Sequence, residues 1–334
     1  MTHLKSVLLI YTGGTIGMYK SGDGGLKAFD LEKLKSQIPE LNSFDINIHT
    51  TSIDTPIDSS NMSQEVWVQL AKIIQTEYTS YDGFVILHGS DTMAYTASIL
   101  SFMLENLQKP VVLTGAQLPI GVRRTDAKEN IISSIEIAAE GTVPEVCVYF
   151  EYRLLRGNRS IKINAEHFEA FKSPNFIPLA EAGLQIKYNP ISYDHTDKEF
   201  TVHTSLSNDV MVLKLFPNMS KSFIESTLRL PYKAIVLETF GSGNATTSDW
   251  FINALKEAIE DSKIILNVSQ CLSGSVSQGL YETSSKLEEL GVISGKDMTT
   301  EAALTKLMYL IGEGYSDEKI KALLQISLRG ELTN

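Results

Sequence analysis

The chain has 334 residues, of which 43% are hydrophobic and 21% are charged, a composition typical of a globular protein long enough for two domains. Its formal net charge of −11 argues against a nucleic-acid partner, because no excess of basic side chains is present to collect phosphates. Two cysteines suggest a reducing compartment, and no apolar run reaches the length of a signal-peptide core or a membrane span. We therefore expect a cytoplasmic protein with no membrane partner.

The first apolar run, residues 7–11, leads into a turn with two adjacent glycines, Gly13 and Gly14. Such a run is typical of a buried parallel strand, and open α/β sheets bind ligands at the carboxyl ends of their strands. Thr12 and Thr15 flank the glycines. The pattern therefore predicts a hydroxyl group where this fold class has its sites, either as a reacting group or as a cap of the turn.

Polar residues follow several of the expected strands at the point where each strand ends. Asp58, Ser59 and Ser60 lie in a loop before a helix, and a turn or helix-entry role is the alternative for them. Ser90 and Asp91 follow an apolar run at 83–87, and Thr114 ends another at 111–113. Because parallel strands share one carboxyl edge, we expect Thr15, Ser90, Asp91 and Thr114 at a common pocket, although a lone Ser-Asp pair usually caps a helix.

Four basic residues recur at every third position: Arg153, Arg156, Arg159 and Lys162. The acidic net charge and a Gly-Asn pair within the run argue against a phosphate-binding face. Lys162 is the only lysine of the four, and an inward-pointing lysine can serve as a base. The alternative is an ordinary lysine in contact with solvent.

The alternation of strands and helices predicts an α/β fold with a larger N-terminal and a smaller C-terminal domain. Each is a three-layer domain with a parallel sheet, and a linker joins them. We place the N-terminal domain at residues 1–182, the linker at 183–208 and the C-terminal domain at 209–334. The other expected helices are 31–38, 93–106, 131–139, 220–228, 249–259, 299–311 and 316–327, and the other expected strands are 46–51, 146–150, 211–215, 234–237 and 264–267.

Several kinds of chemistry are disfavoured by the motifs. The six histidines are scattered without metal-ligand spacing, and the glycine turn matches neither a P-loop nor a dinucleotide fingerprint. A Ser-His-Asp site is weakly supported, since His88 adjoins Ser90 without a GxSxG motif and is more simply a packed core residue. What remains is a hydroxyl nucleophile with a base, a carboxylate and a glycine turn, which suits acyl transfer by a small-molecule hydrolase.

Motifs spread over the whole chain closely resemble the bacterial type I, cytoplasmic L-asparaginase family. The resemblance implies hydrolysis of L-asparagine to L-aspartate and ammonia without a cofactor or metal, by homodimers that pair into homotetramers. The motifs are TGGTIGM (12–18), PIDSSNM (56–62), YDGFVILHGSDTMAYT (81–96), LRGNRSIK (155–162), FGSGN (240–244) and LRGEL (328–332).

The resemblance also implies a role for each site residue. Thr15 would be the nucleophile and would form a β-aspartyl ester that water cleaves. Ser90, Asp91 and Lys162 would form a second polar group, with Lys162 neutral as the base and Asp91 orienting it and binding the substrate's α-amino group. The residues that would hold the substrate's α-carboxylate and amino group are Asp58, Ser59 and Ser60.

The chain departs from the family pattern at two catalytic positions. Ser90 stands where the family usually has threonine, which keeps the hydroxyl with less rotamer restriction. The polar loop after the first strand, residues 19–27, could cover a site or be a plain surface loop. The family usually has a tyrosine there, but this chain has Gly25 at that place, and Tyr19 is the tyrosine that could substitute for it.

A third departure concerns a second, activating asparagine site that some type I members have. Its residues correspond here to Glu238, Asn244, Ser269 and Cys271, with Glu238 at the place of an arginine. A carboxylate cannot replace a cation that clamps the effector's carboxylate, and we expect weak or absent activation. Three alternative functions stay open: a glutaminase-type amidohydrolase, a tRNA-amidotransferase subunit, and a non-catalytic amino-acid sensor.

Overall fold

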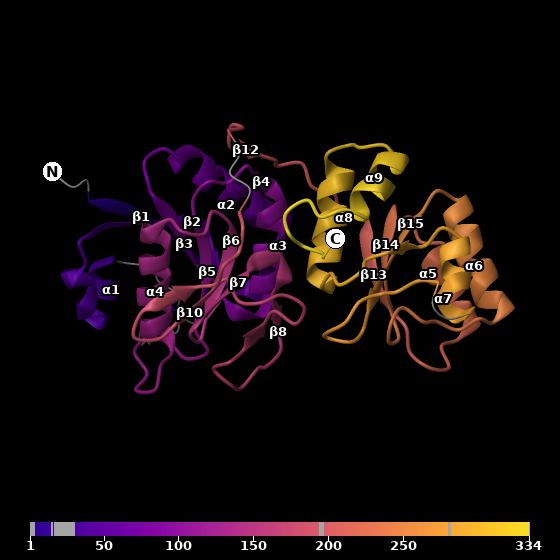
Figure 1. The fold of residues 1–334 in the computed structure, drawn as a ribbon, viewed down its shortest axis with the longest axis horizontal. Helices are drawn as coiled ribbons and strands as arrows, with labels where there is room; N and C mark the ends of the chain where they lie inside the picture. The colour runs from indigo at the N-terminus through magenta and orange to yellow at the C-terminus, as the bar shows by residue number, and fades with distance from the viewer. Residues whose placement is uncertain (1–3, 15, 17–30, 194–196, 280–281, 334) are drawn as a thin grey trace. The chain divides into compact units, whose positions relative to one another are not determined.

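The structure is a computed structural model that describes residues 4–14, 16, 31–193, 197–279 and 282–333. The chain divides into two compact units, Met1–Thr204 and Ser205–Asn334 (Figure 1). Each unit contains a sheet with helices on both faces, and the predicted two-domain α/β fold is confirmed. Among the described helices, none combines the length and the apolar character needed to cross a bilayer.

The first unit is built on an eight-stranded sheet of order β11-β10-β7-β6-β5-β3-β1-β2. The run from β2 to β6 is parallel, and β7, β10 and β11 add antiparallel pairs at the other end. The bounds are β1 Lys5–Gly13, β2 Ile46–Ile57, β3 Gly83–Leu87, β5 Val111–Thr114, β6 Val146–Phe150, β7 Arg153–Arg156, β10 Ala180–Ala182 and β11 Ile186–Tyr188.

The central strands are apolar on both sides because helices cover both faces of the sheet. Every residue of β3, β5 and β6 is buried. In Figure 1, α4 lies on one side of this sheet and α3 on the other. The helices of this unit are α1 Leu31–Gln37, α2 Gln64–Glu77, α3 Met93–Met103 and α4 Ala127–Glu140.

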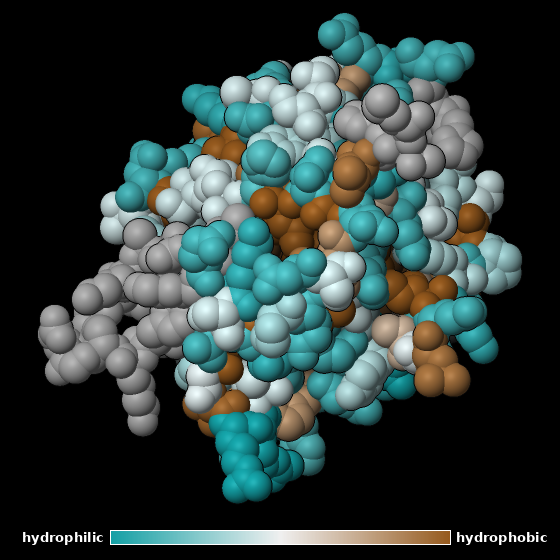
Figure 2. Space-filling view, turned by 90° about the vertical axis from the view of Figure 1, so that its left-hand side faces the viewer, coloured by the Kyte–Doolittle hydropathy of each residue, from teal (hydrophilic) through white to brown (hydrophobic). Residues whose placement is uncertain are grey.

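Short elements connect and extend these layers. The 3-10 turns are η2 Pro39–Ser43, η3 Ser59–Asn61, η4 Ser90–Thr92 and η5 Gly157–Arg159, and the small strand pairs are β4 Leu104–Glu105 with β12 Thr201–Val202 and β8 Ile161–Lys162 with β9 Phe171–Lys172. Helix α3 ends at Met103 rather than at residue 106 as predicted, because Leu104 and Glu105 form β4, which pairs with β12. On the face shown in Figure 2, apolar residues form small patches among polar ones.

The second unit has a four-stranded parallel sheet of order β13-β14-β15-β16. In Figure 1, α5 and α6 lie on one side of it and α8 on the other. Helix α7 and strand β16 were not predicted. The bounds are β13 Val210–Lys214, α5 Lys221–Leu228, β14 Ala234–Thr239, α6 Asp249–Glu260, β15 Ile264–Ser269, α7 Glu282–Glu289, β16 Ile293–Ser294, α8 Thr300–Gly312 and α9 Asp317–Leu324.

A buried ion pair fixes the last residues of the described chain. Lys306 Nζ lies 2.5 Å from a carboxylate oxygen of Glu331, and both side chains are fully buried. Glu331 also accepts hydrogen bonds from the backbone N–H groups of Leu328 and Arg329, at 3.0 Å and 2.7 Å. The acidic residue of the LRGEL motif therefore ties the C-terminal segment to α8.

Candidate active site

Glycines bring three segments of the first unit together at the carboxyl edge of its sheet. Gly14, after β1, has φ 81°, a conformation that favours glycine. A Cβ atom at Gly14 would lie 2.6 Å from the Cα of Gly89, and one at Gly89 would lie 2.6 Å from Oγ of Ser59. The segments that follow β1, β2 and β3 therefore approach at distances that only glycine allows.

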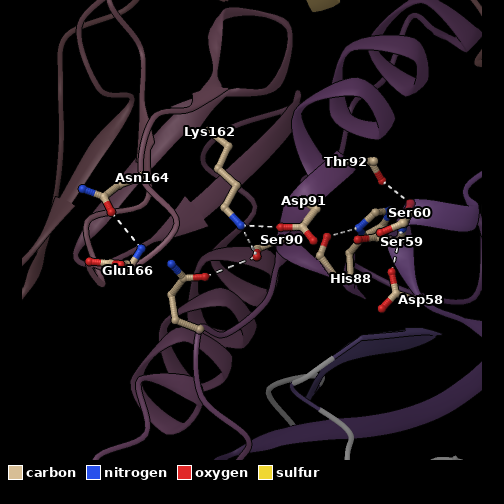
Figure 3. Close-up of polar contacts among 12 residues, drawn as sticks. Asp58, Ser59, Ser60, His88, Ser90, Asp91, Thr92, Lys162, Asn164 and Glu166 are labelled. Atoms are coloured by element: carbon tan, nitrogen blue, oxygen red, sulfur yellow. Dashed lines mark hydrogen bonds and ion pairs between the residues drawn. The ribbon is translucent and has the colours of Figure 1, made fainter.

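Lys162, Ser90 and Asp91 form a hydrogen-bonded cluster at this edge (Figure 3). Lys162 Nζ donates to Asp91 Oδ1 at 2.6 Å and to Ser90 Oγ at 2.8 Å. The side chain of Lys162 is 16% exposed and that of Asp91 is 64% exposed. The ammonium of Lys162 therefore lies between a carboxylate and a hydroxyl, and the exposed carboxylate of Asp91 is accessible to a small ligand.

The neighbouring arginines of the basic run do not share this cluster. Arg156 makes a two-point ion pair with Glu145, with both N···O distances 2.7 Å. Arg159 is buried, and its guanidinium group and that of Arg156 both lie over the ring of Phe176. Lys162 is thus the member of the run that reaches the residues at the end of β3.

Gln117 is part of the cluster, and the sequence analysis did not select it. Ser90 Oγ donates to Gln117 Oε1 at 3.3 Å, and Gln117 Nε2 donates to the carbonyl of His167 at 3.0 Å. Thr114 was expected at the pocket instead, but it is fully buried and its hydroxyl donates to the carbonyl of Tyr149 at 2.9 Å. The signal that could have identified Gln117 is its position in a glycine turn after a buried strand.

Asp58, Ser59 and Ser60 lie in the turn that follows β2. Asp58 Oδ1 accepts a hydrogen bond from the backbone N–H of Ser60 at 2.8 Å, and this bond is the largest cause that lowers the pKa of Asp58. The hydroxyl of Thr92 donates to the carbonyl of Ser59 at 2.8 Å, which ties this turn to the one containing Ser90 and Asp91. The carboxylate of Asp58 is exposed, whereas Ser59 is buried.

His88 is packed in the core, as predicted, and is not a base for Ser90. Its Nδ1 lies 2.6 Å from the carbonyl of Gly89, so this nitrogen carries the proton, and Nε2 accepts from Thr96 Oγ1 at 2.9 Å. Thr96 in turn accepts from Trp67 Nε1 at 2.9 Å. Complete burial lowers the pKa of His88 to about 4. Both ring nitrogens are engaged, and the Ser-His-Asp interpretation fails on geometry.

The two threonines of the first turn differ in what the structure describes. Thr12 is buried, and its hydroxyl donates to the carbonyl of Leu87 at 3.0 Å, which leaves it a structural role. Thr15, Tyr19 and Gly25 lie outside the described residues. Within the described part of the chain, no group of three or more His, Cys, Asp or Glu side chains could hold a metal ion.

The residues expected at an effector site lie near the carboxyl ends of β14 and β15 in the second unit. Glu238 Oε1 accepts from the hydroxyl of Thr300 at 2.6 Å, and its other oxygen lies 3.6 Å from Lys214 Nζ. Ser269 Oγ donates to the carbonyl of Gly241 at 2.6 Å and accepts from the N–H of Cys271 at 3.0 Å.

Asn244 closes the turn between β14 and α6. Its backbone N–H donates to the carbonyl of Phe240 at 2.8 Å, and its carbonyl accepts from the N–H of Phe240 at 2.9 Å. The cysteine beyond β15, Cys271, is exposed. The four predicted effector residues thus share one edge of the second sheet, and the carboxylate of Glu238 is already paired there.

The first unit thus presents a hydroxyl, an amine and a carboxylate beside a glycine turn, the features of an acyl-transfer site on an α/β fold. Family comparisons agree: the model described as "Asparaginase, N-terminal" matches residues 6–192, and the "Glutaminase/Asparaginase C-terminal domain" matches residues 209–324. The chain belongs to the asparaginase family.

Individual relatives match over the full length. L-asparaginase 1 of Escherichia coli (strain K12) is 43% identical over 332 residues, which are 98% of each chain. The crystal structure of L-asparaginase I from Vibrio cholerae superposes with a TM-score of 0.92 at 43% identity and covers 99% of both chains. The thermostable L-asparaginase from Thermococcus kodakarensis gives a TM-score of 0.92 at 31% identity, over 98% of this chain and 99% of that one.

Proposed function

We propose that this chain hydrolyses L-asparagine to L-aspartate and ammonia through an acyl-enzyme intermediate. The observation that carries the proposal is the position of Lys162 Nζ, which is within hydrogen-bond distance of both Ser90 Oγ and Asp91 Oδ1. Asparaginases of similar sequence and full-length coverage support the choice of substrate. No bound cofactor takes part in this chemistry.

The first half of the reaction forms the ester. The hydroxyl of Thr15 attacks the side-chain amide carbon of asparagine and gives up its proton. The tetrahedral intermediate then collapses, and the C–N bond breaks as a proton passes to the nitrogen, which leaves as ammonia. Backbone N–H groups of the glycine turn stabilise the oxyanion, an effect worth about 3–4 kcal/mol for one good donor. The family's loop tyrosine is replaced by Gly25 in this chain, and we assign its role to Tyr19.

The second half of the reaction cleaves the ester. Water attacks the β-aspartyl carbon, and its proton passes through Ser90 to the neutral amine of Lys162. Asp91 orients this amine and stabilises the ammonium that forms, because a carboxylate 2.6 Å from Nζ favours the charged product. The bond between the acyl carbon and Thr15 then breaks, the Thr15 oxygen takes the proton of the newly formed acid group, and L-aspartate leaves.

The substrate's charged groups select the binding residues. Asp58 and Asp91 accept from the α-ammonium group, and the turn of Ser59 and Ser60 donates to the α-carboxylate. The hydrogen bonds that fix Asp58 to Ser60 and Thr92 to Ser59 support this assignment, because they hold the turn against the cluster before substrate arrives. We also propose a cytoplasmic homodimer or homotetramer in which effector activation by asparagine is weak or absent, since Glu238 replaces a cation.

Ammonia release by the purified chain tests the function. L-asparagine should be turned over faster than L-glutamine, and Thr15→Ala and Ser90→Ala should each lower kcat by at least about a hundredfold with an unchanged circular dichroism spectrum. Preference for glutamine would favour the glutaminase alternative. Binding of asparagine without any release of ammonia would favour the amino-acid sensor.

A further inference from the structure

The hydrogen bonds around Ser90 form a chain that runs in one direction. Lys162 Nζ donates to Ser90 Oγ at 2.8 Å, and Ser90 Oγ donates to Gln117 Oε1 at 3.3 Å. Gln117 Nε2 then donates to the carbonyl of His167 at 3.0 Å. Every proton in this chain points away from Lys162.

The carbonyl at the end of the chain fixes this direction. A backbone carbonyl can only accept, so Gln117 must turn its Nε2 toward His167 and its Oε1 toward Ser90. The amide oxygen cannot donate, and the proton between the two side chains must come from the hydroxyl of Ser90. Ser90 therefore has no second proton to offer to Lys162.

Gln117 is itself held in place by its backbone. Its N–H donates to both carboxylate oxygens of Asp126, at 3.1 Å and 2.9 Å, and Asp126 is buried. The carboxylate of Asp126 also accepts from the N–H of Leu118 at 3.1 Å. The turn after β5 thus presents the amide to Ser90 as a fixed acceptor.

We propose that Gln117 is a positioning residue that holds the proton of Ser90 away from Lys162 and so sets the pH range in which Lys162 acts as a base. The inference rests on the proposed function. For Lys162 to act, its ammonium gives one proton to solvent, and the Ser90 hydroxyl leaves Gln117 and donates to the neutral amine. When water attacks, its proton goes to Ser90 Oγ as the proton of Ser90 goes to Nζ.

Gln117 therefore competes with the neutral amine of Lys162 for a single proton. Within the described residues, the charged partner of Lys162 is Asp91, at 2.6 Å. Of the other elements packed against β8, α3 carries Tyr95 as its one titratable side chain, and β9 carries Lys172, which is exposed and pairs with Ile161 rather than Lys162.

Gln117 also lines a cavity of about 410 Å³ together with the titratable residues Arg124, Glu166 and His167. Lys162 is not among the residues that line this cavity. The pH range of the base therefore depends on Asp91 directly and on Gln117 through Ser90.

Two substitutions at Gln117 should move the pH profile in opposite directions. Gln117→Leu removes the acceptor and frees Ser90 to donate to the neutral amine, and the acidic limb of kcat/KM for asparagine should move down by about half a pH unit. Gln117→Glu adds a negative charge that favours the ammonium, and the same limb should move up by about one pH unit. A purely structural role would lower activity without shifting the limb in two directions.

Gln185→Leu is the matched control, because it makes the same substitution at an exposed glutamine in the turn between β10 and β11, away from Ser90 and His167 in the fold. Its limb should stay at the wild-type pH. Unshifted limbs in both Gln117 variants, or shifts in the same direction, would overturn the inference while the wild-type activity stands. If the wild type released no ammonia from L-asparagine at any pH, the proposed function itself would be refuted.

Discussion

Replacing Lys162 with methionine removes the proposed base and keeps most of the volume of its side chain. A positioned general base contributes about 10²–10⁴ in rate, which corresponds to about 3–5 kcal/mol of activation free energy. We therefore expect kcat for L-asparagine to fall by that factor. The loss arises because the Ser90 hydroxyl no longer has an amine at 2.8 Å to which it can pass a proton.

The same substitution should change the free energy of unfolding very little. It leaves Asp91 without its partner, but the Asp91 side chain is 64% exposed and water solvates the carboxylate. An ion pair with one exposed member is worth at most about 1 kcal/mol, so urea unfolding of Lys162→Met should match the wild type within that margin. Activity and stability are thus separated in one variant.

Lys172→Met is the control for this experiment. Lys172 is exposed on β9, next to β8 in the same small sheet, and it is paired with Ile161 rather than with Lys162. Its kcat should stay within about twofold of the wild type. A Lys162→Met enzyme that keeps more than about a tenth of the wild-type kcat would refute the reasoning, because no general base is then being removed.

Three further results follow from the structure. Asp58→Asn should raise KM for asparagine about 10- to 100-fold with a smaller effect on kcat, because a charge-assisted hydrogen bond to the α-ammonium group is lost. If kcat fell by the same factor as kcat/KM, Asp58 would take part in the chemical step instead. Initial velocities should be hyperbolic in asparagine concentration, since Glu238 is paired with Thr300 where an effector carboxylate would need a cation, and clear sigmoidality would contradict this. The third concerns His88, whose pKa is lowered to about 4 by burial, so that its imidazole stays neutral in the folded chain at pH values where it takes up a proton in the unfolded chain. Stability is therefore full above about pH 6.5 and is lost as the pH falls toward about 4, by on the order of 3 kcal/mol, and urea unfolding at about pH 7.5 and about pH 4.5 should show a smaller loss in His88→Gln than in the wild type.

The parallel strands were predictable because they are buried on both faces. Runs such as residues 83–87 and 146–150 contain only apolar residues or glycine, and this composition has few alternatives to a central strand. The short strands at the other end of the sheet carry charged residues, as in β7, and gave no such signal. Helix α7 was missed for a related reason, since its sequence, ETSSKLEE, contains a single apolar residue.

The boundary between the two units was less accessible to sequence reasoning. The stretch 183–208 has the proline and polar residues of a linker, and most of it lies within the first compact unit. Strand β11 extends the eight-stranded sheet beside β10, and β12 pairs with β4. These pairings join residues far apart in the chain, and local composition does not report them.

The candidate site shows the same division between what a local pattern can and cannot reveal. Ser90 and Asp91 stood out because a glycine turn with polar residues follows a buried strand. The partnership with Lys162 joins positions 71 and 72 residues apart, and came from the family resemblance rather than from spacing. Gln117 was overlooked in favour of Thr114, since a sequence does not tell which side chain of a turn faces the pocket and which donates to a neighbouring strand.

Trapping the acyl-enzyme tests the central claim most directly. Lys162→Met, mixed with saturating L-asparagine, quenched in acid and digested with trypsin, should carry one β-aspartyl group on the peptide of residues 6–20, with fragmentation placing it on Thr15. Thr12 in the same peptide should stay unmodified, because its hydroxyl is buried and donates to Leu87. An adduct on the peptide of residues 73–123, which contains Ser90, or no adduct on either peptide, would contradict the account.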